Sequence, residues 1–129
     1  MPRWFFTSRI PQLEQAVADA LETEELHRSK ILAPDAFGTG PPTDGAFYHL
    51  AGVPVMNFLT APFYLFDEMD TLDKVDRDNL ESLSRATIRI VDSTAGVSAA
   101  ELRADVVTAT DSDWSGWRDG VRPGVRCCA

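Results

Sequence analysis

The segment Val53-Pro-Val-Met-Asn-Phe-Leu59 carries the clearest architectural signal of the chain. Apart from Asn57, its side chains are apolar at odd and even positions alike, whereas a strand with one face in water alternates apolar and polar residues. This pattern is typical of a strand that is covered on both faces, as in a parallel sheet under helices. Pro54 must lie near the start of the strand, because it has no backbone N–H to donate. We therefore expect a buried strand over residues 53–59.

Amphipathic helices are predicted before and after this strand. Pro11 suits the first position of a helix, and apolar residues follow it at helical spacing. Thr43 can cap a shorter helix that Gly52 ends. Ser98 and Glu101 have the spacing of a capping box, which marks the start of a last helix. The predicted helices cover residues 11–26, 44–51, 76–91 and 99–108.

One further strand, residues 30–33, is indicated, and the alternation of helices and strands is typical of an α/β fold with parallel strands. Two strands do not make a stable sheet, so either residues 4–7 add a strand or the chain is a piece of a larger domain. We expect a three-layer α/β fold, with a mostly parallel sheet flanked by helices, over residues 1–110. Residues 111–129 are rich in Gly, Ser, Asp and Arg and are expected to form a flexible C-terminal tail.

The composition narrows the classes of partner. The 129-residue chain holds 12 Lys and Arg against 20 Asp and Glu, a formal net charge of −8. Nucleic acid and anionic membranes both require a basic surface, so neither is expected as a partner. The most apolar stretch, residues 50–66, contains two prolines, and the N-terminus lacks the apolar core of a signal peptide. A cytoplasmic location is therefore expected.

An acidic loop follows the buried strand. The loop covers residues 61–75, and a helix is predicted to start directly after it. Six acidic residues lie from Asp67 to Asp78, with only Lys74 and Arg77 as basic residues among them. Loops at the carboxyl ends of parallel strands hold the sites of open α/β sheets. One interpretation is a carboxylate cluster that faces a metal or a substrate. The other is a solvated acidic loop whose aspartates cap helices.

Three aspartates are expected to meet at one edge of the sheet. Asp44 opens the helix before the buried strand, whereas Asp67 and Asp70 follow that strand. If the two predicted strands are parallel, a right-handed connection brings the helix start and the later loop to the same edge. Asp70 can also cap the turn that begins at Thr71, because aspartate readily bonds nearby backbone N–H groups.

Three segments together resemble a known family: Thr43-Asp-Gly-Ala-Phe47, Ala51-Gly-Val-Pro-Val55 and Met69-Asp-Thr-Leu-Asp-Lys-Val75. They are similar to the C-terminal part of the zinc aminopeptidase superfamily, metallopeptidase family twenty-eight, to which glutaminyl cyclases are also similar. In that family a Ser/Thr/Asp-Asp pair opens a helix and a Gly-Ile/Val-Pro turn leads into a buried strand. A loop reading His-Thr-x-x-Asp-Thr-x-Asp-x-Val/Ile then precedes a long terminal helix. The match covers residues 41–91.

The resemblance also assigns candidate site residues. The last zinc ligand of the family is the His four residues before the Asp-Thr pair, where this chain has Phe66, which cannot bind a metal. Asp67 is its neighbour and a carboxylate can bind zinc, so Asp67 is the candidate metal ligand. Asp44, Asp70 and Thr71 would line the site. The other ligands of the family and its Glu-Glu pair have no counterpart here, so no catalytic residue is assigned.

The resemblance implies the C-terminal segment of a zinc aminopeptidase-type hydrolase domain, incomplete and inactive alone. Zinc would be the cofactor of the intact enzyme, and a peptide or an N-terminal amino acid its substrate. Two alternatives are a non-enzymatic interaction module that uses the acidic loop and the aromatic residues 63–66, and a cation-binding module built on the same loop. Self-association through unpaired strand edges is a further expectation.

Overall fold

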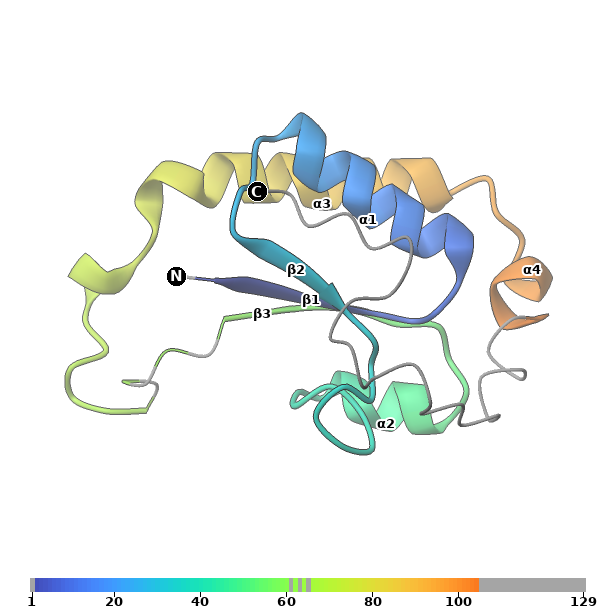
Figure 1. The fold of residues 1–129 in the computed structure, drawn as a ribbon, viewed down its shortest axis with the longest axis horizontal. Coiled ribbons are helices and arrows are strands. Elements are labelled where there is room, and N and C mark those ends of the chain that lie inside the picture. Colours follow the sequence, from blue (N-terminus) through green and yellow to red (C-terminus); the bar gives the residue numbers. More distant parts are fainter. Residues whose placement is uncertain (1, 61, 63, 65, 105–129) are drawn as a thin grey trace, which may run out of the picture.

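The computed structural model describes residues 2–60, 62, 64 and 66–104. Its centre is a three-stranded sheet in the order β2-β1-β3. The strands are β1 (Arg3–Thr7), β2 (Ser29–Leu32) and β3 (Met56–Leu59). β1 is parallel to β2 and antiparallel to β3, so the sheet is mixed and the fold is a small α/β fold (Figure 1).

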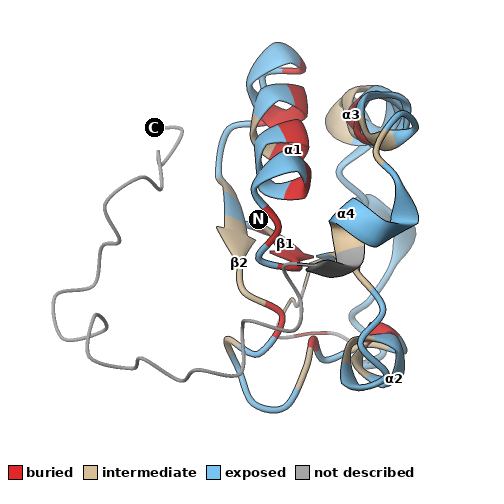
Figure 2. Ribbon diagram, turned by 90° about the vertical axis from the view of Figure 1, so that its right-hand side faces the viewer, coloured by how far each residue is buried: buried red, intermediate tan, exposed pale blue. Residues whose placement is uncertain are grey.

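The helices lie on both sides of this sheet. α1 (Pro11–Thr23) and α3 (Leu80–Thr94) lie side by side over one face, and the short α2 (Gly45–Leu50) lies beyond the other face (Figures 1 and 2). α4 (Ala99–Ala104) follows α3. None of the helices that the structure describes has the length and apolar composition needed to cross a membrane.

β1 is central because its residues are apolar towards both layers. Phe5 points towards α1 and α3 and belongs to the main hydrophobic core, whereas Phe6 points to the other face, where its ring lies 5.7 Å from that of Phe37. Both phenylalanines are buried. The core on the helix side is completed by residues of α1, α3 and the turns beside α1: Ile10, Leu13, Val17, Ala20, Leu21, Leu26, Ala86 and Ile90.

The position of the predicted buried strand requires a correction. Residues 53–59 were expected in a mostly parallel sheet, but the strand is shorter, runs antiparallel to β1 and has a described neighbour on one side only. Val55 is buried, whereas Phe58 is 38% exposed although its ring contacts Phe5. The possible third strand at residues 4–7 does exist, and it is this strand that occupies the centre.

The predicted helices are confirmed with shifted ends. α1 begins at Pro11 as expected and ends at Thr23, whereas α2 begins at Gly45, one residue later than expected, with Asp44 in the capping position in place of Thr43. Gly52 has the left-handed φ of +73° that suits the residue after a helix. A 3-10 turn, Leu72–Lys74, forms in the loop before residue 76, and the helix predicted from residue 76 starts as a second 3-10 turn, Arg77–Asn79, before α3. The capping box of α4 forms as predicted: the Ser98 N–H donates to Glu101, and the Glu101 N–H donates to the Ser98 hydroxyl. The end of the predicted helix 99–108 and the tail 111–129 lie outside the described residues.

Candidate functional site

The acidic loop begins with a local turn that uses the carboxylate of Asp67. The backbone N–H of Met69 donates to Asp67 Oδ1 at 2.9 Å, and the N–H of Asp70 donates to the Asp67 carbonyl oxygen at the same distance. Both aspartates are exposed. Such a turn is the ordinary role of aspartate in loops, so one carboxylate oxygen of Asp67 is already engaged within the chain.

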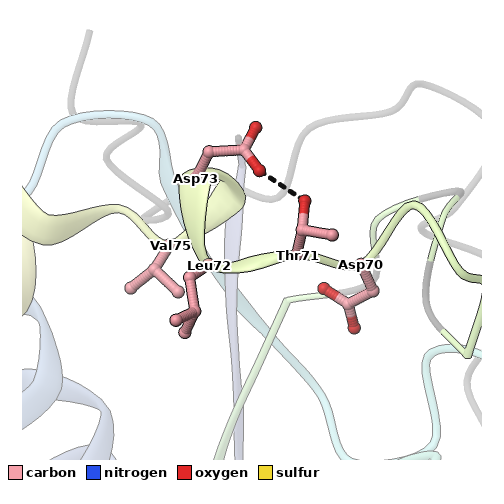
Figure 3. Close-up of a pocket in the computed structure, with 5 residues that line it drawn as sticks. All are labelled: Asp70, Thr71, Leu72, Asp73 and Val75. Atoms are coloured by element: carbon pink, nitrogen blue, oxygen red, sulfur yellow. Dashed lines mark hydrogen bonds between the residues drawn. The ribbon is translucent and has the colours of Figure 1, made fainter.

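An open pocket lies along the next residues, lined by Asp70, Thr71, Leu72, Asp73 and Val75 (Figure 3). The Thr71 hydroxyl and the Lys74 ammonium both donate to the carboxylate of Asp73. These two hydrogen bonds hold the pKa of Asp73 below its ordinary value, and the bond from Lys74 has the larger effect. Figure 3 shows the carboxylates of Asp70 and Asp73 on opposite sides of the chain segment, so the two do not form a pair.

Asp76 fixes the end of the loop to the start of the sheet. Its Oδ1 accepts a hydrogen bond from Asn79 Nδ2 at 2.7 Å, and its Oδ2 pairs with Arg3 at 2.5 Å. The bond from Asn79 and then the pairing with Arg3 lower the pKa of Asp76. Arg3 is nearly buried and also donates to the carbonyl oxygen of His27. Asp76 was predicted to start a helix and to be one of the six acidic residues of the loop. Its contact with Arg3 was not predicted, because the two residues are 73 positions apart.

The start of α2 is held against β3 rather than against the acidic loop. The Thr43 hydroxyl accepts a hydrogen bond from the Gly45 N–H at 3.1 Å and donates to Asn57 Oδ1 at 3.0 Å. Gly45 lies so close to Asn57 that a Cβ at this position would come within 2.3 Å of its amide group. Asp44 is exposed and caps α2 without a side-chain hydrogen bond.

Asp44 was expected beside Asp67 and Asp70 because the strands were predicted to be parallel. That prediction is wrong, since β3 is antiparallel to β1. α2 follows the carboxyl end of β2, and the acidic loop follows the carboxyl end of β3. Because β2 is parallel to β1 and β3 is antiparallel to it, these two strand ends lie at opposite ends of the sheet (Figure 1). Within the described part of the chain, no three His, Cys, Asp or Glu side chains are grouped so that they could hold a metal ion.

Phe66 has an unusual conformation. Its φ is +68°, in the left-handed region that bulky residues rarely adopt, and its side chain is 96% exposed. Met69 and Leu72 on the same loop are also exposed. Strain of this kind is often kept at functional positions.

A partly buried ionic contact lies between α1 and α3. Glu24, at the end of α1, has a side chain that is only 4% exposed, and its two oxygens accept hydrogen bonds from Arg85 Nε and Arg89 Nε, each at 2.6 Å. These hydrogen bonds lower the pKa of Glu24, and the bond from Arg89 has the largest effect. The sequence analysis missed this contact, since its partners are more than 60 positions apart.

Comparison of the chain with models of protein families, with curated proteins and with solved structures gave no match. The resemblance to zinc aminopeptidases therefore stays a prediction from the sequence motifs.

Proposed function

We propose that the chain is the C-terminal segment of a three-layer, zinc aminopeptidase-like hydrolase domain and that it has no peptidase activity alone. The observation that carries the proposal is Phe66, at the position where the resembled family has its last zinc ligand. Its backbone lies in the left-handed region, and strain of this kind clusters at functional positions.

The order of elements supports the same proposal. A helix opened by Thr43-Asp44, a Gly-Val-Pro turn, a short apolar strand, an acidic loop and a long helix follow one another as the resemblance implies. Phe66, Met69 and Leu72 expose large apolar surfaces around the loop, which a larger domain would cover.

Zinc would belong to the intact domain, as would a peptide or N-terminal amino acid as substrate. This chain would contribute the carboxylate of Asp67, whose second oxygen is not used in the turn with Met69, and Asp70 and Thr71 would lie nearby. Asp44 lies at the opposite end of the sheet and takes no part in this proposal. A catalytic zinc needs three protein ligands and an open position, and a general base beside it. No catalytic step is assigned to this chain. The proposed location of the protein is the cytoplasm.

Two measurements test the proposal. The purified chain is titrated with zinc by calorimetry, and no dissociation constant below the micromolar range is expected. The chain is also assayed for release of the N-terminal residue from aminoacyl substrates, and no release is expected. Zinc-dependent release by the chain alone would refute the claim that it is inactive. The genomic DNA upstream of Met1 is then read in frame, where His-x-Asp, a bridging Asp and a Glu-Glu pair are expected. An in-frame stop codon directly upstream would contradict the proposed larger domain.

The alternative is an interaction module, and the exposed aromatic residues favour it. Phe47, Tyr48 and Leu50 of α2 are each more than 60% exposed, and Phe37 is similarly open. Exposed apolar patches of this kind mark binding surfaces. The aromatic segment 63–66, which was expected to serve this role, lies partly outside the described residues. If the upstream DNA holds none of the ligand motifs, this alternative replaces the peptidase proposal.

A further inference from the structure

The pair Asp44-Gly45 at the start of α2 is chemically reactive by its sequence. In an Asp-Gly pair the backbone nitrogen of the glycine can attack the carboxyl carbon of the aspartate, because glycine has no side chain to hinder the approach. A C–N bond forms, and the hydroxyl group of the protonated carboxyl leaves as water with the proton of the N–H. Water then opens the resulting five-membered succinimide ring at either carbonyl group. The products are aspartate and isoaspartate, in which the main chain runs through the side-chain carbons.

The fold favours the aspartate and requires the glycine of this pair. Asp44 occupies the capping position of α2, where aspartate is among the preferred residues. Gly45 is buried, and a Cβ at this position would come within 2.3 Å of the amide group of Asn57 on β3. A larger residue at position 45 would slow the reaction but would disturb the contact between α2 and β3. The reactive pair is therefore a consequence of how α2 packs.

The folded conformation keeps the two reacting groups apart. The N–H of Gly45 donates to the Thr43 hydroxyl at 3.1 Å, and this hydroxyl donates to Asn57 Oδ1 at 3.0 Å, so the attacking nitrogen is held by its own hydrogen bond. Asp44 has a helical ψ of −21°. Ring closure requires Asp44 Cβ and the Gly45 nitrogen to be nearly eclipsed about the Cα–C bond, which a helical ψ does not allow. Both obstacles exist only while the start of α2 keeps this conformation against β3.

We infer that Asp44-Gly45 is a modification site that converts to isoaspartate when α2 separates from β3 and is protected while the two are packed together. The reacting groups belong to one chain and the co-reactant is water, so no partner is needed. Among the six described residues of α2, only Gly45 is buried, and such an element opens without unfolding of the core. The inference concerns α2 alone and does not depend on zinc or on the peptidase proposal.

Conversion changes the start of α2 in a lasting way. The N–H of Phe47 donates to the carbonyl oxygen of Asp44 at 3.2 Å. In isoaspartate this carbonyl group becomes a free carboxylate beside the main chain, and an additional carbon separates residue 44 from Gly45. The bonds from Phe47 to Asp44 and from Gly45 to Thr43 then lose their spacing, so α2 of the converted chain is expected to stay apart from β3. Mass and net charge do not change.

The rate of conversion in the folded chain tests the inference. The purified full chain and a synthetic peptide of residues 41–50 are incubated at neutral pH for several weeks. Peptide mapping with electron-transfer fragmentation then quantifies isoaspartate at residue 44 and separates it from the other Asp-Gly pair, residues 119–120, which lies outside the described residues. The chain should convert about tenfold or more slowly than the peptide, because a minor open state is populated a tenth of the time or less. Equal rates would overturn the inference.

Two variants locate the protection at α2. Thr43→Val keeps the shape of the side chain but removes its hydrogen bonds with Gly45 and Asn57, and it should raise the rate at residue 44 by about fivefold or more. The same substitution in the peptide should leave the peptide rate unchanged. Glu24→Gln weakens the contact between α1 and α3 instead and is the control, with a rate expected near that of the wild type.

Three results of these variants would contradict the inference. One is an equal acceleration by Thr43→Val and Glu24→Gln, which would mean that conversion follows unfolding of the whole molecule. Another is an unchanged rate in Thr43→Val. The third is a lack of isoaspartate at residue 44 in both wild type and Thr43→Val over a period in which the peptide converts. Slow amide exchange at Phe5 verifies that the core of each variant remains folded.

Discussion

At the scale of single residues, Glu24 is the side chain whose loss should be most informative. Glu24→Gln keeps the shape of the side chain but leaves Arg85 and Arg89 without a carboxylate between them. A buried carboxylate with two guanidinium donors is a contact in which losing one partner costs much more than at the surface. We expect the melting temperature to fall by several degrees, measured by circular dichroism at neutral pH. Glu22→Gln, the same substitution at an exposed position of the same helix, is the control and should change it little.

The same variant should show a defined pH dependence. The pKa of Glu24 in the folded chain lies below its ordinary value of 4.5, so its ionised form stabilises the fold above pH 4.5. This stabilisation is lost as the pH falls through the lower, folded pKa. The difference in melting temperature between wild type and Glu24→Gln should therefore be full at pH 6 to 7 and shrink at acidic pH. A constant difference down to pH 2 would show that the loss comes from packing and not from charge.

At the scale of the elements, the contact between α2 and β3 depends on a glycine. Gly45→Ala would place a methyl group 2.3 Å from the amide of Asn57 and displace it from Thr43. Such overpacking costs about 1–3 kcal/mol of unfolding free energy, measurable by urea denaturation. Gly96→Ala is the matched control, because no atom lies within 4 Å of its added Cβ. Adding Asn57→Ala to Gly45→Ala should recover part of the loss; an additive double mutant would contradict the proposed contact.

Which elements form could be predicted from the sequence, but how they pair could not. Periodicity and capping residues located α1, α2 and α4, because these signals are local. The apolar pattern of residues 53–59 predicted a strand covered on both faces, but no residue of β3 is buried and Phe58 is exposed, because β3 lies at an edge of the described sheet. Nor does such a pattern say whether the neighbouring strand is parallel or antiparallel. The predicted convergence of Asp44 with Asp67 depended on that direction, so it was lost with the parallel sheet. Glu24 and its arginines were invisible for the same reason, since their contact is set by how α1 packs on α3.

At the scale of the whole molecule, the two faces of the sheet are unequally supported. α1 and α3 share a continuous core with β1, whereas α2 has six residues and exposes Phe47, Tyr48 and Leu50. Short helices with few buried contacts open at lower free energy than the core of a domain. The molecule is therefore expected to open first on the face of α2.

Native-state hydrogen exchange tests this order. The amides of Phe5 and Phe6 should exchange slowest, because β1 is paired on both sides and covered by helices on its inner face. The amides of α2 should exchange through local opening, with protection well below that of β1 and little dependence on denaturant. In Gly45→Ala the protection of the α2 amides should fall further, because the strained contact lies on the face of α2. The protection of the Phe5 amide should fall only by the global loss of stability. If α2 and β1 instead lost protection together in every condition, the domain would unfold as one cooperative unit, and Thr43 and Asn57 would couple the two faces more strongly than their single hydrogen bond indicates.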